Sequence, residues 1–102
     1  MTKRIPGPTD VDERPPILIS DGDAIGLKQA RYLVGRDAKT IKRWCREYGI
    51  GFNVVRGAEW EISAPGVVLV RHADWVGLEL LRSGQREHPR VRRVLEHLGI
   101  AP

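Results

Sequence analysis

The residues of this sequence whose types and spacing could do chemistry form one short run of cations around a single hydroxyl. They lie between positions 37 and 49 and are Lys39, Thr40, Lys42, Arg43 and Arg46. A helix whose polar face carries cations and a hydroxyl suits the major groove of DNA. The run therefore predicts binding of nucleic acid, and the plainer alternative is a solvated helical face.

Side chains that serve catalysis or metal binding are present but scattered. The three histidines lack the i, i+3 or i+4 spacing of a metal site, and the single cysteine, Cys45, excludes an intramolecular disulfide. Beside Trp44, Cys45 is expected to be a small packed residue. The paired acids Asp12/Glu13 and Glu59/Glu61 lie in segments that read as exposed. We therefore expect no enzyme, no metal site and no cofactor.

The cations must be positioned by a helix, and both of its ends are marked in the sequence. Asp37 is a good N-cap, because its carboxylate can accept hydrogen bonds from the free N–H groups of the first turn. Gly49 suits the left-handed residue that ends a helix. Between them apolar side chains recur at i, i+3/4 and i+7, which gives a buried stripe of Ile41, Trp44/Cys45 and Tyr48.

A shorter helix is expected just before this one, over residues 27–34. Gly35 closes this helix, and only residues 35–37 then join the two helices, which is the arrangement of a helix-turn-helix unit. The small side chain of Ala30 would let the two helices approach closely. Lys28, on the polar side of the first helix, and Arg36, in the connection, are expected to assist at phosphates.

A β-hairpin is expected after the second helix. Alternation places Trp60 and Ile62 on one face of its second strand, and Phe52 and Val54 would match the buried face of the first strand. An Arg-Gly pair supplies the turn. Arg56 at this tip could reach a phosphate or the minor groove, or remain a solvated turn residue. The acids of the second strand indicate that this wing is mainly structural.

Residues 24–63 resemble the winged helix-turn-helix domains of the excisionase-like and MerR-like type. The resemblance rests on LKQA and LVG in the first helix, TIKRW in the second helix and WEI in the hairpin. It departs from the MerR pattern after residue 63, where no long antiparallel dimerisation coil, cysteine cluster or ligand domain follows. The wing is also more acidic than a typical DNA-contacting wing.

This resemblance implies a mainly α fold with a small β-hairpin, a winged helix-turn-helix, to which a C-terminal helical extension is added. It also implies that Lys39 and Thr40 approach bases or phosphates, at the N-terminal part of the second helix. Arg43 and Arg46 would then run along the DNA backbone, and Trp44 would plug the core.

The segments before this unit are short and rich in proline. Residues 1–16 contain four of the seven prolines and few apolar side chains, so an extended or disordered arm is expected. Lys3 and Arg4 at its tip could touch phosphate, although the acids of the arm do not suit DNA. Residues 17–19 could pack as an edge segment, and residues 20–23 read as a turn.

The C-terminal part, residues 64–102, is expected to pack on the same core as residues 17–63. Ser63 can cap a helix that runs for about 18 residues. Its apolar phase, which includes His72 and Val76, favours one continuous helix over two pieces broken near Asp74.

The remaining side chains of the C-terminal part leave two alternatives open. Trp75 lies off the centre of the apolar stripe and could cover the core edge or form a dimer contact. A last helix begins at Pro89, a residue suited to the first helical position. Its cations are either a second phosphate-binding cluster or surface charge, and they are Arg90, Arg92 and Arg93.

Length and charge agree with one small nucleic-acid-binding domain. The 102 residues, 41% of them hydrophobic, suffice for one modest core. The formal net charge is +4, and residues 27–49 hold seven cations against two acids, as expected for a footprint on phosphates. No apolar run approaches the ~20 residues that span a membrane, and no signal-peptide core is seen. We expect a cytoplasmic protein that does not bind membranes.

The expected function is non-catalytic, sequence-specific binding of double-stranded DNA by a protein of prokaryotic or phage type. It would act as a transcriptional regulator or as an excisionase-like architectural factor, and its C-terminal helices could form a homodimer. The alternative is a protein-interaction or oligomerisation module on a winged-helix scaffold, for example in a recombination or packaging complex.

Overall fold

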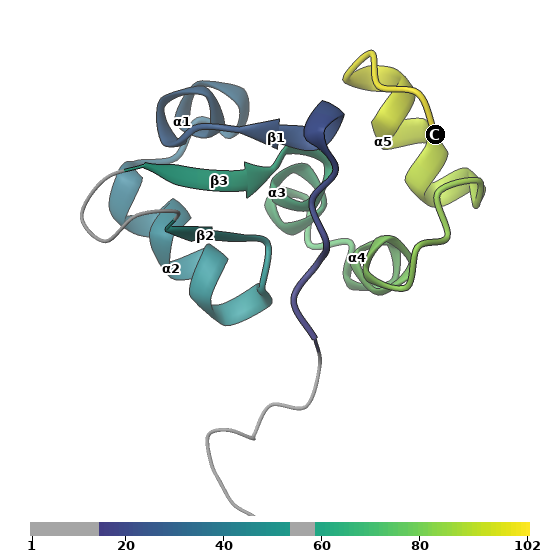
Figure 1. Cartoon of the computed structure of the whole chain (residues 1–102), viewed down its shortest axis with the longest axis horizontal. Coiled ribbons are helices and arrows are strands. Elements are labelled where there is room, and N and C mark those ends of the chain that lie inside the picture. The colour runs from purple at the N-terminus through teal and green to yellow at the C-terminus, as the bar shows by residue number, and fades with distance from the viewer. Residues whose placement is uncertain (1–14, 54–58) are drawn as a thin grey trace, which may run out of the picture.

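Helices pack against a small sheet in the part of the chain that the structure, a computed structural model, describes: residues 15–53 and 59–102 (Figure 1). The expected arm, up to residue 14, and the tip of the hairpin with Arg56 lie outside these residues. A short 3-10 helix, η2, precedes the first strand. The elements are η2 (Asp21–Asp23), β1 (Ala24–Ile25), α1 (Leu27–Val34), α2 (Ala38–Tyr48), β2 (Gly51–Asn53), β3 (Trp60–Ser63), α3 (Ala64–Arg71), α4 (Trp75–Arg82) and α5 (Pro89–His97).

The helix ends follow the capping residues predicted from the sequence. Gly35 and Gly49 end α1 and α2 in the left-handed conformation, at φ +66° and +65°, where a side chain would be strained. Ser63 caps α3, and its hydroxyl oxygen accepts a hydrogen bond from the Gly66 N–H at 3.0 Å. Pro89 is the first residue of α5. The mainly helical fold with a small antiparallel sheet is therefore confirmed.

The prediction of one continuous helix over residues 64–82 is wrong, because the chain breaks between α3 and α4. Ala73 takes a left-handed conformation at φ 56°, and the Asp74 N–H donates to the Leu69 carbonyl at 2.9 Å. Asp74 then caps α4 by accepting from the Gly77 N–H at 2.9 Å. Every residue from Ala64 to Val70 is buried. Because this part of α3 has no polar face, its apolar residues do not define a stripe that could be traced into the next helix.

Residues placed on that supposed stripe are also displaced from the core. His72 and Val76 are exposed, Val76 to 57%. Trp75 is 46% exposed, and its ring lies 5.0 Å from that of Tyr48 on α2. Trp75 therefore contacts Tyr48, which packs against the core, while part of the Trp75 side chain stays in solvent.

The sheet has three antiparallel strands in the order β1-β3-β2. Its edge strand β1 was not predicted, whereas Ile17, at the start of the expected edge segment, is buried and donates its N–H to the Gly49 carbonyl at 2.9 Å. In β2, Phe52 pairs with Glu61 and is 50% exposed, so its predicted burial is wrong. The buried face of β2 carries Gly51, opposite the fully buried Ile62.

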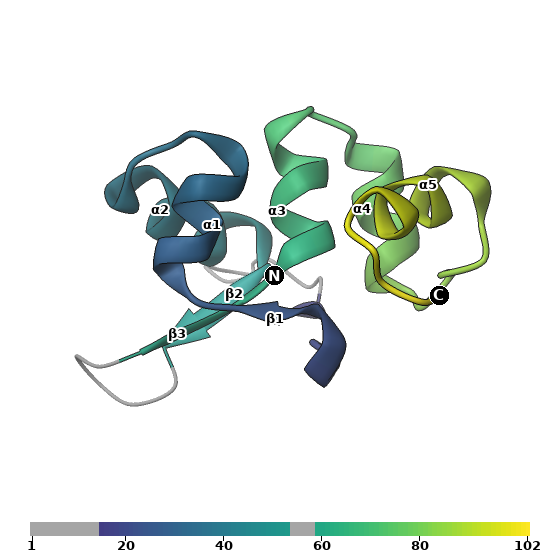
Figure 2. The ribbon, with the colours of Figure 1, turned by 90° about the horizontal axis from the view of Figure 1, so that it is seen from above.

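The core is centred on α3, which contacts α1, α2, α4, α5 and β3. Figure 2 shows α3 between the α1–α2 pair on one side and the α4–α5 pair on the other. In the same view, α1 and α2 lie on the same side of the sheet, where they pack against each other. One hydrophobic cluster includes residues from both parts of the chain, from Ile17 to Leu95, so residues 17–63 and 64–102 share a single core.

Two buried or half-buried arginines tie distant segments together. Arg82, whose side chain is 5% exposed, donates to the Tyr48 carbonyl at 2.8 Å and to the Pro15 carbonyl at 2.7 Å. Arg86 forms a two-pronged ion pair with the buried Asp23, at 2.8 and 3.1 Å. The hydrogen bond to Asp23 raises the pKa of Arg86, although partial burial opposes this.

Candidate nucleic-acid interface

The cations of α2 lie on the side of the helix opposite its buried face. Ile41 and Cys45 are buried, and Trp44 and Tyr48 pack half-buried beside them. The cations follow the helical spacing i, i+3, i+4 and i+7, so they share one stripe. Lys42 is half-buried and the other three are exposed; the stripe consists of Lys39, Lys42, Arg43 and Arg46.

The first turn of α2 is fixed by a cap in which Thr40 takes part. Asp37 Oδ1 accepts from the Thr40 N–H at 2.9 Å. Hydrogen bonds from the side chain and backbone of Thr40 hold the pKa of the Asp37 carboxyl below its ordinary value. Asp37 is therefore ionised at neutral pH, and Thr40, a predicted DNA contact, is half-buried and engaged in this cap.

The position of α2 is set by contacts along its whole length. Ala30, fully buried on α1, permits the close approach of the two helices that its small size predicts. On the other side, a Cβ at Gly51 would lie 2.8 Å from Cys45 Sγ, so β2 passes tightly beneath α2. Arg82 holds the C-terminal end through the Tyr48 carbonyl. These contacts present the cation stripe on a rigid element.

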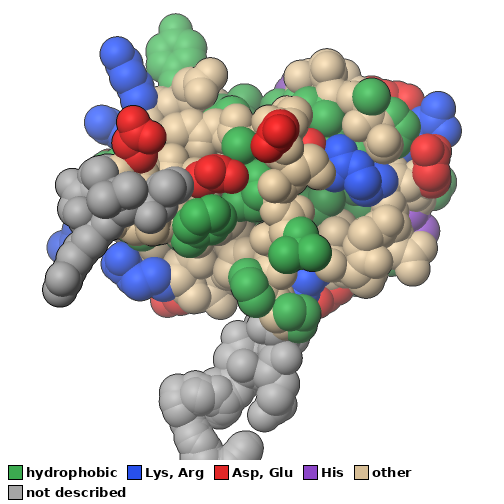
Figure 3. All heavy atoms as spheres, viewed as in Figure 1, with side chains coloured by type: hydrophobic (Ala, Val, Ile, Leu, Met, Phe, Trp, Pro, Cys, Tyr) green, Lys and Arg blue, Asp and Glu red, His purple; other side chains and the backbone are tan. Residues whose placement is uncertain are grey.

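Most of this stripe has no acidic partner. Arg43 forms an exposed ion pair with Glu47 at 3.9 Å. Within residues 15–53 and 59–102, no carboxylate pairs with Lys39, Lys42 or Arg46. Figure 3 shows Lys and Arg side chains projecting from the end of the molecule where α1 and α2 lie. The arrangement can attract phosphate groups without first breaking buried ion pairs.

The predicted assisting residues are more dispersed. Arg36 is exposed in the turn between α1 and α2, where Nη1 donates to the Gly35 carbonyl at 3.2 Å. Lys28 is exposed on α1 and lines a groove beside Gln29 and Tyr32. Arg56 lies outside the described residues.

Arg71 is a cation near this site that the sequence did not indicate. It is exposed at the end of α3, and its Nε donates to the Val34 carbonyl at 3.2 Å. It therefore adds positive charge beside the turn that carries Arg36. No local pattern could reveal it, because 37 residues separate Arg71 from Val34 along the chain.

The cations of α5 are largely neutralised. Arg90 pairs with Asp74 at 2.9 Å, and Arg92 pairs with Glu87 at 3.2 Å and with Glu96 at 3.1 Å. Burial disfavours the charged form of Asp74, but hydrogen bonds from Gly77 and Arg90 outweigh it and lower its pKa. Of the two readings of this cluster, surface charge fits these ion pairs better than phosphate binding does.

No other chemical site competes with the α2 stripe in the described part of the chain. Burial raises the pKa of the Cys45 thiol to about 11, so the thiol stays protonated and unreactive at neutral pH. Among the residues that the structure describes, no group of three potential ligands could hold a metal ion. None of their helices combines the length and hydrophobicity needed to cross a bilayer.

Comparisons with protein families, with curated proteins and with solved structures found no match for this chain.

Proposed function

We propose that this protein is a winged helix-turn-helix module that binds double-stranded DNA, with α2 as the helix that enters the major groove. The observation that carries the proposal is the stripe of four cations on α2, three of them without an acidic partner in the described part of the chain. Such a stripe, backed by a buried face, matches the shape and charge of the major groove.

The elements around α2 support this proposal by their order. A three-residue connection separates α1 from α2, and the strands β2 and β3 follow α2 directly. A recognition helix between a supporting helix and a hairpin is the order of a winged helix-turn-helix. Glu59 is exposed and Glu61 half-buried on the described part of the hairpin; these acids disfavour phosphate contact there, so α2 would carry most of the binding. A transcriptional regulator and an excisionase-like architectural factor both fit this role.

Titration of a fluorescent duplex of random sequence with the whole chain tests the proposal. Because bound cations release counterions, the logarithm of the association constant should fall linearly with the logarithm of the salt concentration. Four phosphate contacts predict a slope of roughly −3 to −4. Fluorescence anisotropy at several salt concentrations gives this slope, and absence of binding at low salt would refute the proposal.

Glu47→Gln should strengthen DNA binding by roughly twofold at low salt, since an exposed ion pair of this spacing is worth about 0.3–0.5 kcal/mol. The substitution frees Arg43 and removes a negative charge from the DNA-facing side of α2. The matched control is Glu96→Gln, which breaks a similar i, i+4 pair with Arg92 on α5. If both variants gain affinity equally, the gain comes from the net charge of the protein and not from the position of Glu47 on α2.

A second candidate function is a protein-interaction module on the same scaffold. The observation that favours it is the exposure of Trp75 and Val76 on α4, at 46% and 57%. Elution from heparin at low salt, together with no mobility shift of duplex DNA, would favour this function over DNA binding.

A further inference from the structure

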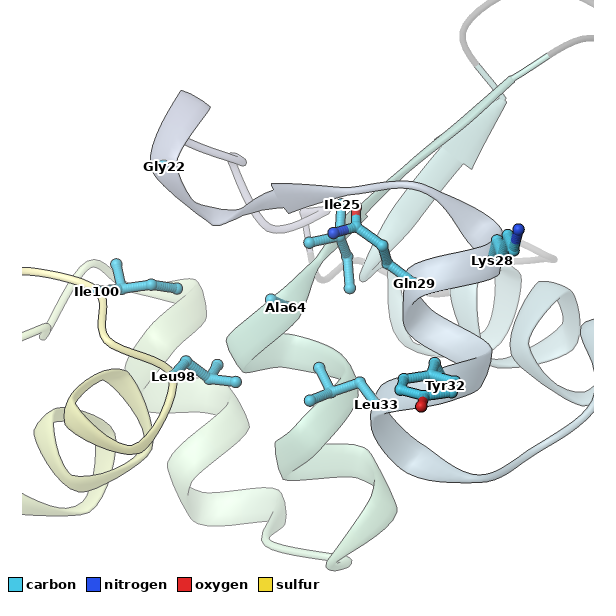
Figure 4. Close-up of a pocket in the computed structure, with 9 residues that line it drawn as sticks. All are labelled: Gly22, Ile25, Lys28, Gln29, Tyr32, Leu33, Ala64, Leu98 and Ile100. Carbon is cyan, nitrogen blue, oxygen red and sulfur yellow. The ribbon is translucent and has the colours of Figure 1, made fainter.

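An apolar groove of about 580 Å³ lies between α1 and the residues that follow α5. Leu33 of α1 and Leu98 point toward each other across it in Figure 4, with Ala64 at the start of α3 between them. Ile25 and Ile100 extend the apolar lining. The groove therefore joins β1, α1, α3 and the C-terminal residues into one hydrophobic surface.

The rim of this groove is far more exposed than a hydrophobic core requires. Tyr32 is 94% exposed and Leu33 is 39% exposed, whereas Ala30 and Val34 of the same helix are buried. Apolar side chains gathered around an open groove on a small protein mark an interaction site. The residues that line the groove include none from α2, so an occupant of the groove would leave the cation stripe of α2 accessible.

The charge of the lining indicates which occupant fits. Lys28 is the single charged side chain among the described residues that line the groove, and no acid accompanies it. An occupant that buries apolar side chains in the groove would complement it best by placing a carboxylate beside Lys28. Electrostatic complementarity of this kind selects partners and orients them.

The groove is also held in shape before any partner arrives. The Gln29 side chain accepts from the Gly26 N–H at 3.5 Å, which fixes the start of α1. At the other end, Arg86 binds Asp23 and donates to the Ala101 carbonyl at 3.2 Å. The neighbours of those two residues, Gly22 and Ile100, line the groove. Preorganisation lowers the entropic cost of binding.

We propose that the groove binds an amphipathic helix of a partner protein, with apolar side chains on one face and an acid positioned for Lys28. A helix suits an open groove because its polar face remains in solvent, whereas an isolated apolar ligand would stay partly exposed beside Tyr32. A second copy fits less well. The surface of a second copy that could enter the groove is the exposed apolar face of α4. Its acid, Glu79, already pairs with Arg82 at 3.2 Å and would have to break that pair to reach Lys28.

Selection from a displayed library of amphipathic helices tests this proposal. The library keeps apolar residues at i, i+3, i+4 and i+7 and randomises the flanking positions among Asp, Glu, Lys, Ser and Gln. Against the whole chain, the selected helices should be enriched in acids. Against Lys28→Glu, enrichment should shift to lysine. Helices selected on the wild type should lose at least about tenfold in affinity for Tyr32→Glu, since losing an aromatic side chain that a partner buries commonly costs this much.

Val76→Glu is the matched control, because it adds the same charge to the exposed apolar residue of α4 and should leave peptide binding unchanged. Circular dichroism checks that each variant is folded. Selection of no helix, or of helices without charge preference, would overturn the proposal. If an apolar dye with a carboxylate group binds the groove and no helix does, the groove is a site for a small molecule and not for a helix. Self-association of the wild type that Tyr32→Glu abolishes would identify a second copy as the occupant.

Discussion

Replacing Lys42 and Arg43 together by alanine should lower the affinity for duplex DNA at least about tenfold and flatten its salt dependence. Both side chains belong to the stripe on α2, and each is expected to displace one condensed counterion from the DNA. Loss of two phosphate contacts should reduce the magnitude of the log–log salt slope by roughly 2. The affinity should fall for all sequences, because phosphate contacts carry no sequence information.

The matched control for this double variant is Arg92→Ala with Arg93→Ala. It also removes two adjacent cations from an exposed helical surface, but it acts on α5, where Arg92 is already paired with two acids. The control should keep the wild-type slope. Thermal melts establish that both double variants are folded, which matters because Lys42 is half-buried. Equal losses in the two double variants would show that DNA responds to net charge alone and would count against α2 as the recognition helix.

Arg86→Ala should be strongly destabilising and lower the free energy of unfolding by about 3 kcal/mol. It leaves the carboxylate of Asp23, which is 2% exposed, without the two guanidinium hydrogen bonds that now neutralise it. It also releases the C-terminal residues, since Arg86 donates to the Ala101 carbonyl. For a chain of this size the melting temperature should fall by roughly 10–20 °C.

A double-mutant cycle separates this ion pair from a simple loss of packing. If the cost comes from an unpaired buried charge, Asp23→Ala combined with Arg86→Ala should be less destabilised than the two single changes added together, by about 2 kcal/mol. Urea denaturation of the four proteins measures the difference. Arg92→Ala breaks only exposed pairs and should cost less than about 1 kcal/mol. Additive single changes would mean that Asp23 and Arg86 do not act as a pair.

The parts of the fold that the sequence predicted correctly are those decided by neighbouring residues. Asp37 and Ser63 as caps, and Gly35 and Gly49 as left-handed ends, depend only on free backbone groups within one turn. The buried stripe of α2 was equally local. Both ends and both faces of the candidate recognition helix were therefore predictable.

The errors occurred where contacts distant in sequence decide the conformation. Gly51 lies so close to Cys45 that no side chain fits at this position of β2, and the neighbouring Phe52 is turned outward. Ala73 adopts a left-handed conformation that alanine disfavours. No residue type near it in the sequence predicts this conformation. Arg71 and Arg86 meet partners 37 and 63 residues away, so neither the added charge near α2 nor the tie to Asp23 could be read from spacing.

The burial of α3 from Ala64 to Val70 has a consequence for the way the chain can be divided. A fragment that ended at residue 63 would retain α1, α2 and the sheet but would expose the apolar residues that α3 covers. A fragment that began at residue 64 would place a helix without a polar face in water. Because α3 contacts the helices on both sides of it, we expect the two parts to fold and unfold together. The DNA-binding unit we propose is therefore the whole described chain. The part up to residue 63 is not expected to fold and bind DNA without the C-terminal helices.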